Sequence, residues 1–141
     1  MKALNCWVHG AHQLAKGVGF IGDHEDLFGT LYTKADSQFD SVCERALGLG
    51  VPDTFSEPSS MFEKVLTELK TFPKISGTTE ESLMTNTKAV LDKVCQTITE
   101  KTKQIPEKDL TRGLDNLLAQ INDEIEGFGY KFSRRTKKDN S

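Results

Sequence analysis

The sequence predicts an all-α protein. Apolar residues recur at intervals of three and four along most of the chain, and the strict alternation typical of strands is absent. Glycine and proline are concentrated between the periodic segments, where they predict helix ends. With 141 residues, of which 28% are charged, the chain has the size and polarity of one ordinary water-exposed domain.

The first half of the chain predicts two helices joined by a glycine turn. A helix from about Lys2 to Lys16 is followed by a turn at Gly17 and Gly19. The next helix starts near Leu27 and extends for roughly 25 residues. Its apolar or small residues are Leu27, Phe28, Leu31, Tyr32, Ala35, Phe39, Val42, Cys43, Ala46 and Leu49. It ends at the helix-breaking residues Gly48, Gly50 and Pro52.

The second half predicts one short helix and two long ones. The short helix extends over residues 59–71, with Ser59 as its N-cap. Thr79 opens the third main helix, which reaches about Lys103, and Pro106 separates it from the last. The last helix repeats apolar residues at a near-heptad spacing that suits antiparallel bundle packing. These residues are Leu110, Leu114, Leu117, Leu118, Ile121, Ile125 and Phe128.

The chain ends in a basic segment. We interpret residues 1–132 as the helical domain and residues 133–141 as a basic, flexible tail. A short cationic tail often binds phosphates, and a solvated helix end whose cations complement the helix dipole is an equal alternative. Because the net charge is −3, any DNA contact must be local, and we expect DNA binding to be weak or absent. The basic residues available for it are Arg134, Arg135, Lys137 and Lys138.

The composition argues against several other classes of protein. No stretch approaches the ~18 uninterrupted apolar residues of a membrane span, and residues 1–20 lack the apolar core of a signal peptide. We therefore expect a cytoplasmic protein without membrane contact. Three widely spaced cysteines, Cys6, Cys43 and Cys95, predict free buried thiols. The motifs of nucleotide-binding loops, serine hydrolases and zinc proteases are absent.

Two groups of candidate metal ligands lie near the amino terminus. His12 and His24 stand in the spacing H-x4-G-x2-F-x3-H, and Asp40 and Glu44 stand in D-x3-E-R-x3-L-G. Imidazoles and carboxylates together suit a transition metal such as Fe(II), which accepts nitrogen and oxygen ligands. Taken alone, such a histidine more often packs, and such an acidic pair is more often a solvated helix edge. His9 lies outside both patterns, and we interpret it as structural or exposed.

In this order, the two patterns resemble the first half of a mini-ferritin of the Dps type, the DNA-protecting ferritins of starved bacteria. The match covers residues 12–50. The resemblance implies a ferritin-like four-helix bundle with a short extra helix between the second and third helices. It also implies iron as the bound metal, oxidised at a ferroxidase site between the subunits of a hollow homo-oligomer, usually a dodecamer. Asp40 and Glu44 would then reach the histidines of a neighbouring subunit. Trp7 would pack in the core or, as a family-like alternative, quench radicals beside the iron.

The second histidine departs from the family pattern. His24 precedes Asp40 by 16 residues, one more than in the family, and on an unbroken helix positions 16 apart point in nearly opposite directions (about 160° apart). In one alternative, the extra residue lies before the helix and Glu25 takes the ligand position. We prefer it because the apolar register requires the extra residue before Phe28. In the other, a π-bulge between His24 and Phe39 absorbs the residue and His24 is the ligand.

The resemblance predicts an iron-binding mini-ferritin that oxidises Fe(II) with peroxide or dioxygen, stores ferric iron and protects DNA from oxidative damage. The alternative is a non-catalytic helical assembly or DNA-compacting protein that has lost ferroxidase activity. Two departures motivate it. His24 is displaced by one residue from the family position, and Phe28 or Gly29 stands where the family has an acidic residue. The second departure leaves two alternatives, one or two irons per site.

Overall fold

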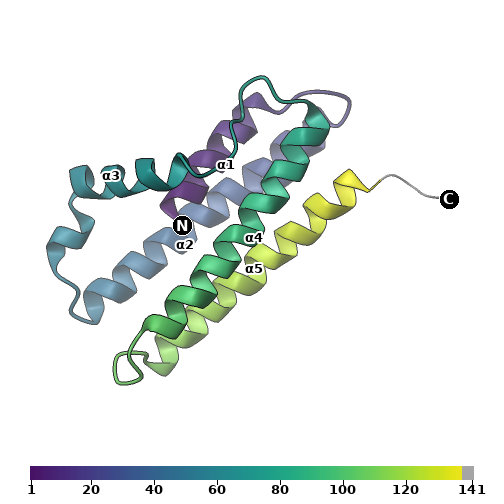
Figure 1. The fold of residues 1–141 in the computed structure, drawn as a ribbon. Coiled ribbons are helices and arrows are strands. Elements are labelled where there is room, and N and C mark those ends of the chain that lie inside the picture. Colours follow the sequence, from purple (N-terminus) through teal and green to yellow (C-terminus); the bar gives the residue numbers. More distant parts are fainter. Residues whose placement is uncertain (138–141) are drawn as a thin grey trace.

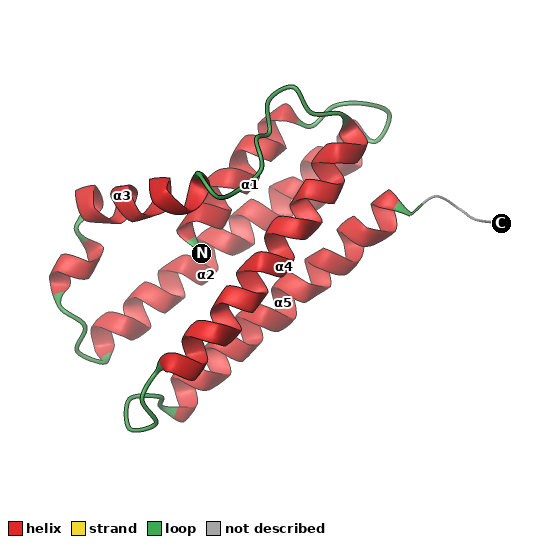
Figure 2. Cartoon of the chain, viewed as in Figure 1, coloured by secondary structure: helices red, strands yellow, loops and turns green. Residues whose placement is uncertain are grey.

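The structure is a computed structural model that describes residues 1–137, and within this range it contains helices and loops but no strand (Figure 2). Its elements are α1 (Lys2–Leu14), the π-helix η1 (Gly22–Gly29), α2 (Thr30–Gly48), the 3₁₀-helix η2 (Asp53–Ser56), α3 (Pro58–Leu69), α4 (Glu80–Gln104) and α5 (Arg112–Thr136). The prediction of an all-α fold is confirmed.

The longer helices form two antiparallel pairs (Figure 1). α1 packs against the continuous segment of η1 and α2, and α4 packs along α5. α2 and α4 run in the same direction, because the chain between them returns from one end of the molecule to the other. α3 lies in this long connection, at an angle to the other helices, and contacts α1.

The core lies between the two helix pairs. Phe28, Leu31 and Ala35 are fully buried at the spacing that the sequence predicts for one helix face. Phe28 packs against Phe132 of α5, with ring centroids 5.1 Å apart. Burial of such side chains is the main stabilising contribution to the fold. The largest fully buried side chains are Phe28, Phe132, Leu4, Leu31, Met84, Leu91, Ile121, Ile125, Val8, Val90 and Thr87.

The predicted start of α4 is confirmed. Thr79 caps α4 as predicted, because its hydroxyl accepts a hydrogen bond from the backbone N–H of Ser82 at 3.1 Å. The predicted Ser59 cap of α3 is wrong. This helix begins at Pro58, and Glu57 occupies the cap position without a side-chain hydrogen bond. Proline suits the first helical turn, where its missing N–H needs no partner.

The turn between the first two helices is shorter than predicted. α1 ends at Leu14, since Ala15 already has extended backbone angles (φ −57°, ψ 137°). Gly17 has φ +98°, a conformation that favours glycine. Helical structure resumes at Phe20, well before Leu27, and continues through η1 into α2.

The carboxyl end of the described chain is helical. α5 continues past residue 132, where the sequence analysis begins a flexible tail, and ends at Thr136. Arg134 and Arg135 lie in its last turn, which is the arrangement of the helix-end alternative. Lys138 lies outside the described residues.

Two further expectations bear on the surface of the protein. Among residues 1–137, no helix is long and apolar enough to cross a membrane. The three cysteines are free, as predicted, but only partly buried, so the expectation of fully buried thiols is wrong.

Candidate metal centre

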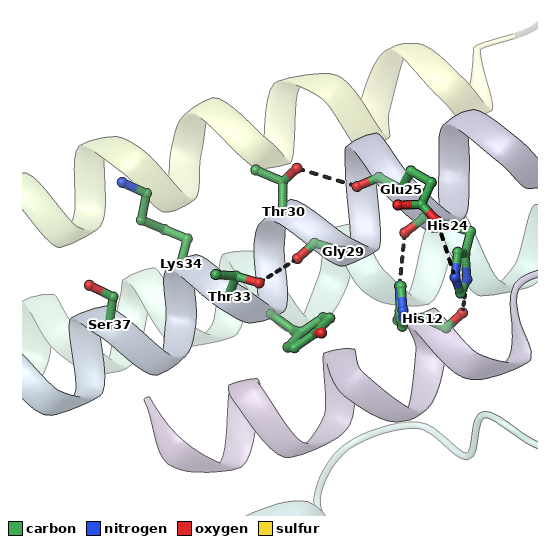
Figure 3. A pocket seen from close by; sticks show the side chains of 9 residues that line it. His12, His24, Glu25, Gly29, Thr30, Thr33, Lys34 and Ser37 are labelled. Carbon is green, nitrogen blue, oxygen red and sulfur yellow. Dashed lines mark hydrogen bonds and ion pairs between the residues drawn. The ribbon is translucent and has the colours of Figure 1, made fainter.

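His12 and His24 form a stacked pair between α1 and η1 (Figure 3). Nδ1 of His12 lies 2.8 Å from the carbonyl oxygen of His24, and Nδ1 of His24 lies 2.8 Å from the carbonyl oxygen of His12. The ring centroids are 3.7 Å apart and the planes differ by 20°. Because a carbonyl oxygen only accepts hydrogen bonds, both Nδ1 atoms carry the proton in the neutral rings. Both Nε2 atoms therefore keep a free lone pair.

The position of His12 explains why its carbonyl is available. His12 lies in the last turn of α1, which ends at Leu14. The last four carbonyl groups of an α-helix have no N–H partner within the helix. The imidazole of His24 supplies the missing donor. The histidine pair therefore also closes the end of α1.

The histidine pair lines an open pocket of about 640 Å³. The polar side chains around it are Glu25, Thr30, Thr33, Lys34 and Ser37. Oε1 of Glu25 lies 3.6 Å from Nε2 of His24. Two imidazoles and a carboxylate thus line one solvent-accessible pocket (Figure 3).

Aromatic rings surround the histidine pair. Phe20, the aromatic residue of the first pattern, stacks on His24 with centroids 5.0 Å apart. The ring of Tyr32 lies 5.0 Å from that of His12. His9 is exposed, as expected, and stacks on Tyr32 at 4.6 Å. Neighbouring rings therefore restrict the movement of both imidazoles.

Trp7 belongs to the core rather than to this pocket. It is 4% exposed, and its Nε1 donates a hydrogen bond to the carbonyl of Pro73 at 2.8 Å. Its ring meets Phe72 edge to face, with centroids 6.5 Å apart. The prediction that Trp7 packs in the core is confirmed. The aromatic residue that lines the pocket of the histidines is Tyr32.

His24 and Glu25 lie in the π-helix η1, whose hydrogen bonds span five residues rather than four. Two threonines make this visible (Figure 3). Thr30 donates its hydroxyl to the carbonyl of Glu25, five residues back, whereas Thr33 donates to Gly29, four residues back. The unbroken helix assumed in the Glu25 alternative is therefore absent. The structure contains the π distortion that the His24 alternative requires.

Two buried residues explain why this segment is π-helical. Asp23 and Phe28 are 3% and 0% exposed and stand five residues apart, which an α-helix would turn to directions about 140° apart. The longer π turn returns them to one side. Phe28 packs on Phe132, while Asp23 binds Arg135. Phe132 and Arg135 are three residues apart on α5 and share a face. Two anchors on α5 thus select the π-helical register.

Arg135 joins Asp23 and Glu80 in one charge network. Its Nε and Nη2 donate to the two carboxylate oxygens of Asp23 at 3.0 and 2.9 Å, and Nη2 also donates to Glu80. The hydrogen bonds from Arg135 to Asp23 raise the pKa of the guanidinium above its ordinary value. Sequence reasoning missed Asp23. The available signal was an acidic residue five positions before the apolar Phe28.

Asp40 and Glu44 lie elsewhere on α2 and are exposed. Asp40 does not line the pocket and stands three residues beyond Ser37, the last residue of α2 that does. Glu44 lines a separate groove with Arg45. Within the described chain, no three histidine, cysteine or acidic residues are placed to hold a metal ion together. His12, His24 and Glu25 line one pocket but are not placed to share an ion, and Asp40 and Glu44 lie outside that pocket.

The pocket therefore offers an incomplete set of mixed donors. Imidazole nitrogen and carboxylate oxygen suit Fe(II) and related divalent metals. Ligand imidazoles usually donate their other ring N–H to a carbonyl or carboxylate, as both imidazoles do here. No family model, curated protein or solved structure matches this chain.

Proposed function

We propose that this protein is a mini-ferritin-like subunit. It binds Fe(II), oxidises it with peroxide or dioxygen and stores the ferric product in a hollow homo-oligomer. The observation that carries the proposal is the reciprocal hydrogen bonding of His12 and His24, which leaves both Nε2 lone pairs free beside one pocket. Consuming Fe(II) and peroxide together protects DNA without contact to it.

The fixed tautomers of the two rings support a ligand role. A metal ligand needs an unprotonated nitrogen and a held ring orientation, and a second hydrogen bond supplies both. His12 and His24 obtain this bond from each other's backbone, so neither depends on a distant partner.

The arrangement of the helices also supports the proposal. Ferritin-like folds combine two antiparallel helix pairs with one long crossover connection. Here α1 with α2 and α4 with α5 are the pairs, and the segment containing α3 is the long connection (Figure 1). The histidine pair lies in an open pocket at the surface of one pair, where a second subunit can approach.

We propose that Asp40 and Glu44 of a second copy complete the site. They are exposed and one helical turn apart, so both carboxylates can reach one ion. Carboxylates stabilise Fe(III) more than Fe(II), because the attraction grows with the charge of the ion. Peroxide accepts two electrons and each Fe(II) supplies one, so two Fe(II) ions are consumed per peroxide. This chain positions the iron ions and supplies the negative charge that stabilises Fe(III), and iron supplies the electrons.

An anaerobic Fe(II) titration followed by peroxide tests the proposal, with the absorbance of the ferric product as the measurement. His12→Ala should lose Fe(II) binding and oxidation, because it removes one imidazole and the ring on which His24 stacks. The hydrogen bond from His24 to the backbone carbonyl of residue 12 remains in this variant. His9→Ala is the matched control, since His9 lies on the same helix but outside the pocket lining. It should retain Fe(II) binding and oxidation, because His9 supports His12 only through the ring of Tyr32.

Two outcomes would count against the proposal. Equal loss in the His9 and His12 variants would indicate unspecific binding to surface imidazoles. Wild-type oxidation rates in both His12→Ala and Glu44→Ala would remove the ferroxidase site. In the latter case, a helical assembly without oxidation becomes the better account of the chain.

A further inference from the structure

We infer that Arg135 is a positioning residue for the histidine pair: through Asp23 it holds η1 in its π-helical register and keeps the ring of His24 against His12. The inference deepens the proposed function and rests on it for its effect on metal binding. Its structural part concerns the metal-free protein. Arg135 stands 112 residues beyond Asp23, in the last turn of α5.

The first step is the burial of Asp23. Its side chain is only 4% exposed, and a carboxylate so far from water is costly unless it is paired and hydrogen-bonded. Arg135 meets this need with two nearly parallel bonds, from Nε at 3.0 Å and from Nη2 at 2.9 Å. A bidentate guanidinium sets the orientation of a carboxylate as well as its position. Glu80 binds the same guanidinium from α4.

The second step is the connection from Asp23 to His24. The two residues are adjacent, so the direction of one side chain determines that of the other. Phe28 is fixed in the core by Phe132. If the bond to Arg135 is lost, the segment before Phe28 is free to adopt the ordinary α-helix, because π-helices are rare. The side chain of Asp23 then no longer points to the same side of the helix as that of Phe28, and the side chain of His24 changes direction with it. Both hydrogen bonds of the histidine pair require His24 in its present place.

The turn before η1 lies in close contact with the side chains of this network. A β-carbon at Gly19 would stand 2.8 Å from Oδ2 of Asp23 and 3.1 Å from Cζ of Arg135. A β-carbon at Gly17, which has φ +98°, would likewise come too close to the carboxylate of Glu80. Two glycines of one turn thus leave room for the side chains of the ion pairs. The packing of α1 onto η1 and the charge network form one structural unit.

The test is ¹⁵N NMR of the histidine rings in metal-free protein, which distinguishes protonated from unprotonated ring nitrogens. In the wild type, His12 and His24 should both be Nδ1–H tautomers. Arg135→Gln should mix the tautomers of these two rings and leave the exposed His9 unchanged. Arg134→Gln is the matched control, because its side chain is exposed on the same turn of α5. It should retain the wild-type spectrum.

Two further variants separate positioning from general stability. Asp23→Asn keeps the shape of the side chain but removes its charge, and it should mix the tautomers as Arg135→Gln does. Arg135→Lys keeps the charge but loses the bidentate geometry, so it should mix the two tautomers to an intermediate extent. If the other variants do not fold, unchanged His12 and His24 signals in Arg135→Lys would overturn the inference. A folded Asp23→Asn or Arg135→Gln protein with unchanged His12 and His24 signals would overturn the inference, even with a lowered melting temperature.

Co(II) titration measures the consequence for the proposed function. Arg135→Gln should weaken Co(II) binding by about 10- to 100-fold relative to Arg134→Gln, as expected when support for ligand imidazoles is removed. Equal Co(II) affinity of the two variants would contradict a positioning role. If the wild type binds neither Co(II) nor Fe(II), the proposed function fails, whereas the NMR comparison still tests the role of Arg135 by itself.

Discussion

Gly29 lies directly against His12. A β-carbon at Gly29 would stand 2.9 Å from the carbonyl oxygen of His24 and 3.5 Å from Cε1 of the His12 ring. The last residue of η1 therefore has to be small for the histidine pair to close. This contact also bears on the acidic residue that the mini-ferritin pattern places at Phe28 or Gly29. One of the two positions is buried in the core, and the other is in contact with the histidines.

Gly29→Ala should therefore separate the two imidazoles and destabilise the fold by about 1–3 kcal/mol, the usual range for overpacking. Gly22→Ala is the matched control in the same π-helix, because nothing lies within 4 Å of its added β-carbon. That variant should gain about 0.4–1 kcal/mol through a less flexible unfolded chain. Thermal unfolding and the NMR signals of the rings measure both effects. Identical behaviour of the two variants would contradict this account.

His24→Ala should abolish Fe(II) oxidation, whereas Glu25→Ala should only reduce it. The reason is the π-helix, which places His24 on His12 and leaves the carboxylate of Glu25 70% exposed. Initial rates after addition of peroxide provide the measurement. A rate lost in Glu25→Ala and kept in His24→Ala would restore the carboxylate as the ligand.

Purified protein should elute as a large closed oligomer, dodecameric if the resemblance to mini-ferritins holds. The physical reason is that Asp40 and Glu44 do not line the pocket of the histidines in their own chain, so a site that uses all four residues needs a second copy. Analytical ultracentrifugation at micromolar concentration measures the mass. A monomer would exclude a site shared between subunits.

DNA binding should be weak or absent at physiological salt. The net charge of each chain is −3, and Arg135 is already bound by two carboxylates. Any residual binding should depend on the exposed Arg134 and Lys137. Removing both cations should reduce the log-log salt slope by about 2, and Arg135→Gln should not reduce it. Tight, salt-resistant retardation of plasmid DNA would show this expectation to be wrong.

The thiol of Cys95 should be unreactive near neutral pH. Burial, and then the nearby Glu126 and Asp92, raise its pKa to about 11. The folded state thus binds the thiol proton more tightly than the unfolded state. The associated stabilisation is complete below the ordinary thiol pKa of 9.0 and is lost as the pH rises toward about 11. Alkylation rates of Cys95 between pH 7 and 11 provide the check. Rapid labelling at pH 8 in the folded protein would contradict the shift.

The sequence by itself determines the helical class and most helix positions, because the signals involved are local. Apolar spacing identified Phe28, Leu31 and Ala35 as one buried face. The side chain of Thr79 caps α4 as the sequence predicts. The spacing of His12 and His24 also singled out two residues that the structure brings into contact.

Only the tertiary structure decided the register of η1 and the pairing of the histidine rings. Helix propensity and spacing near Asp23 contain no information about Arg135 or Phe132, which lie more than 100 residues away in the sequence. The burial of a carboxylate and an aromatic ring against α5 outweighs the preference for a regular α-helix. The π-helix and the place of His24 on His12 follow from these long-range contacts.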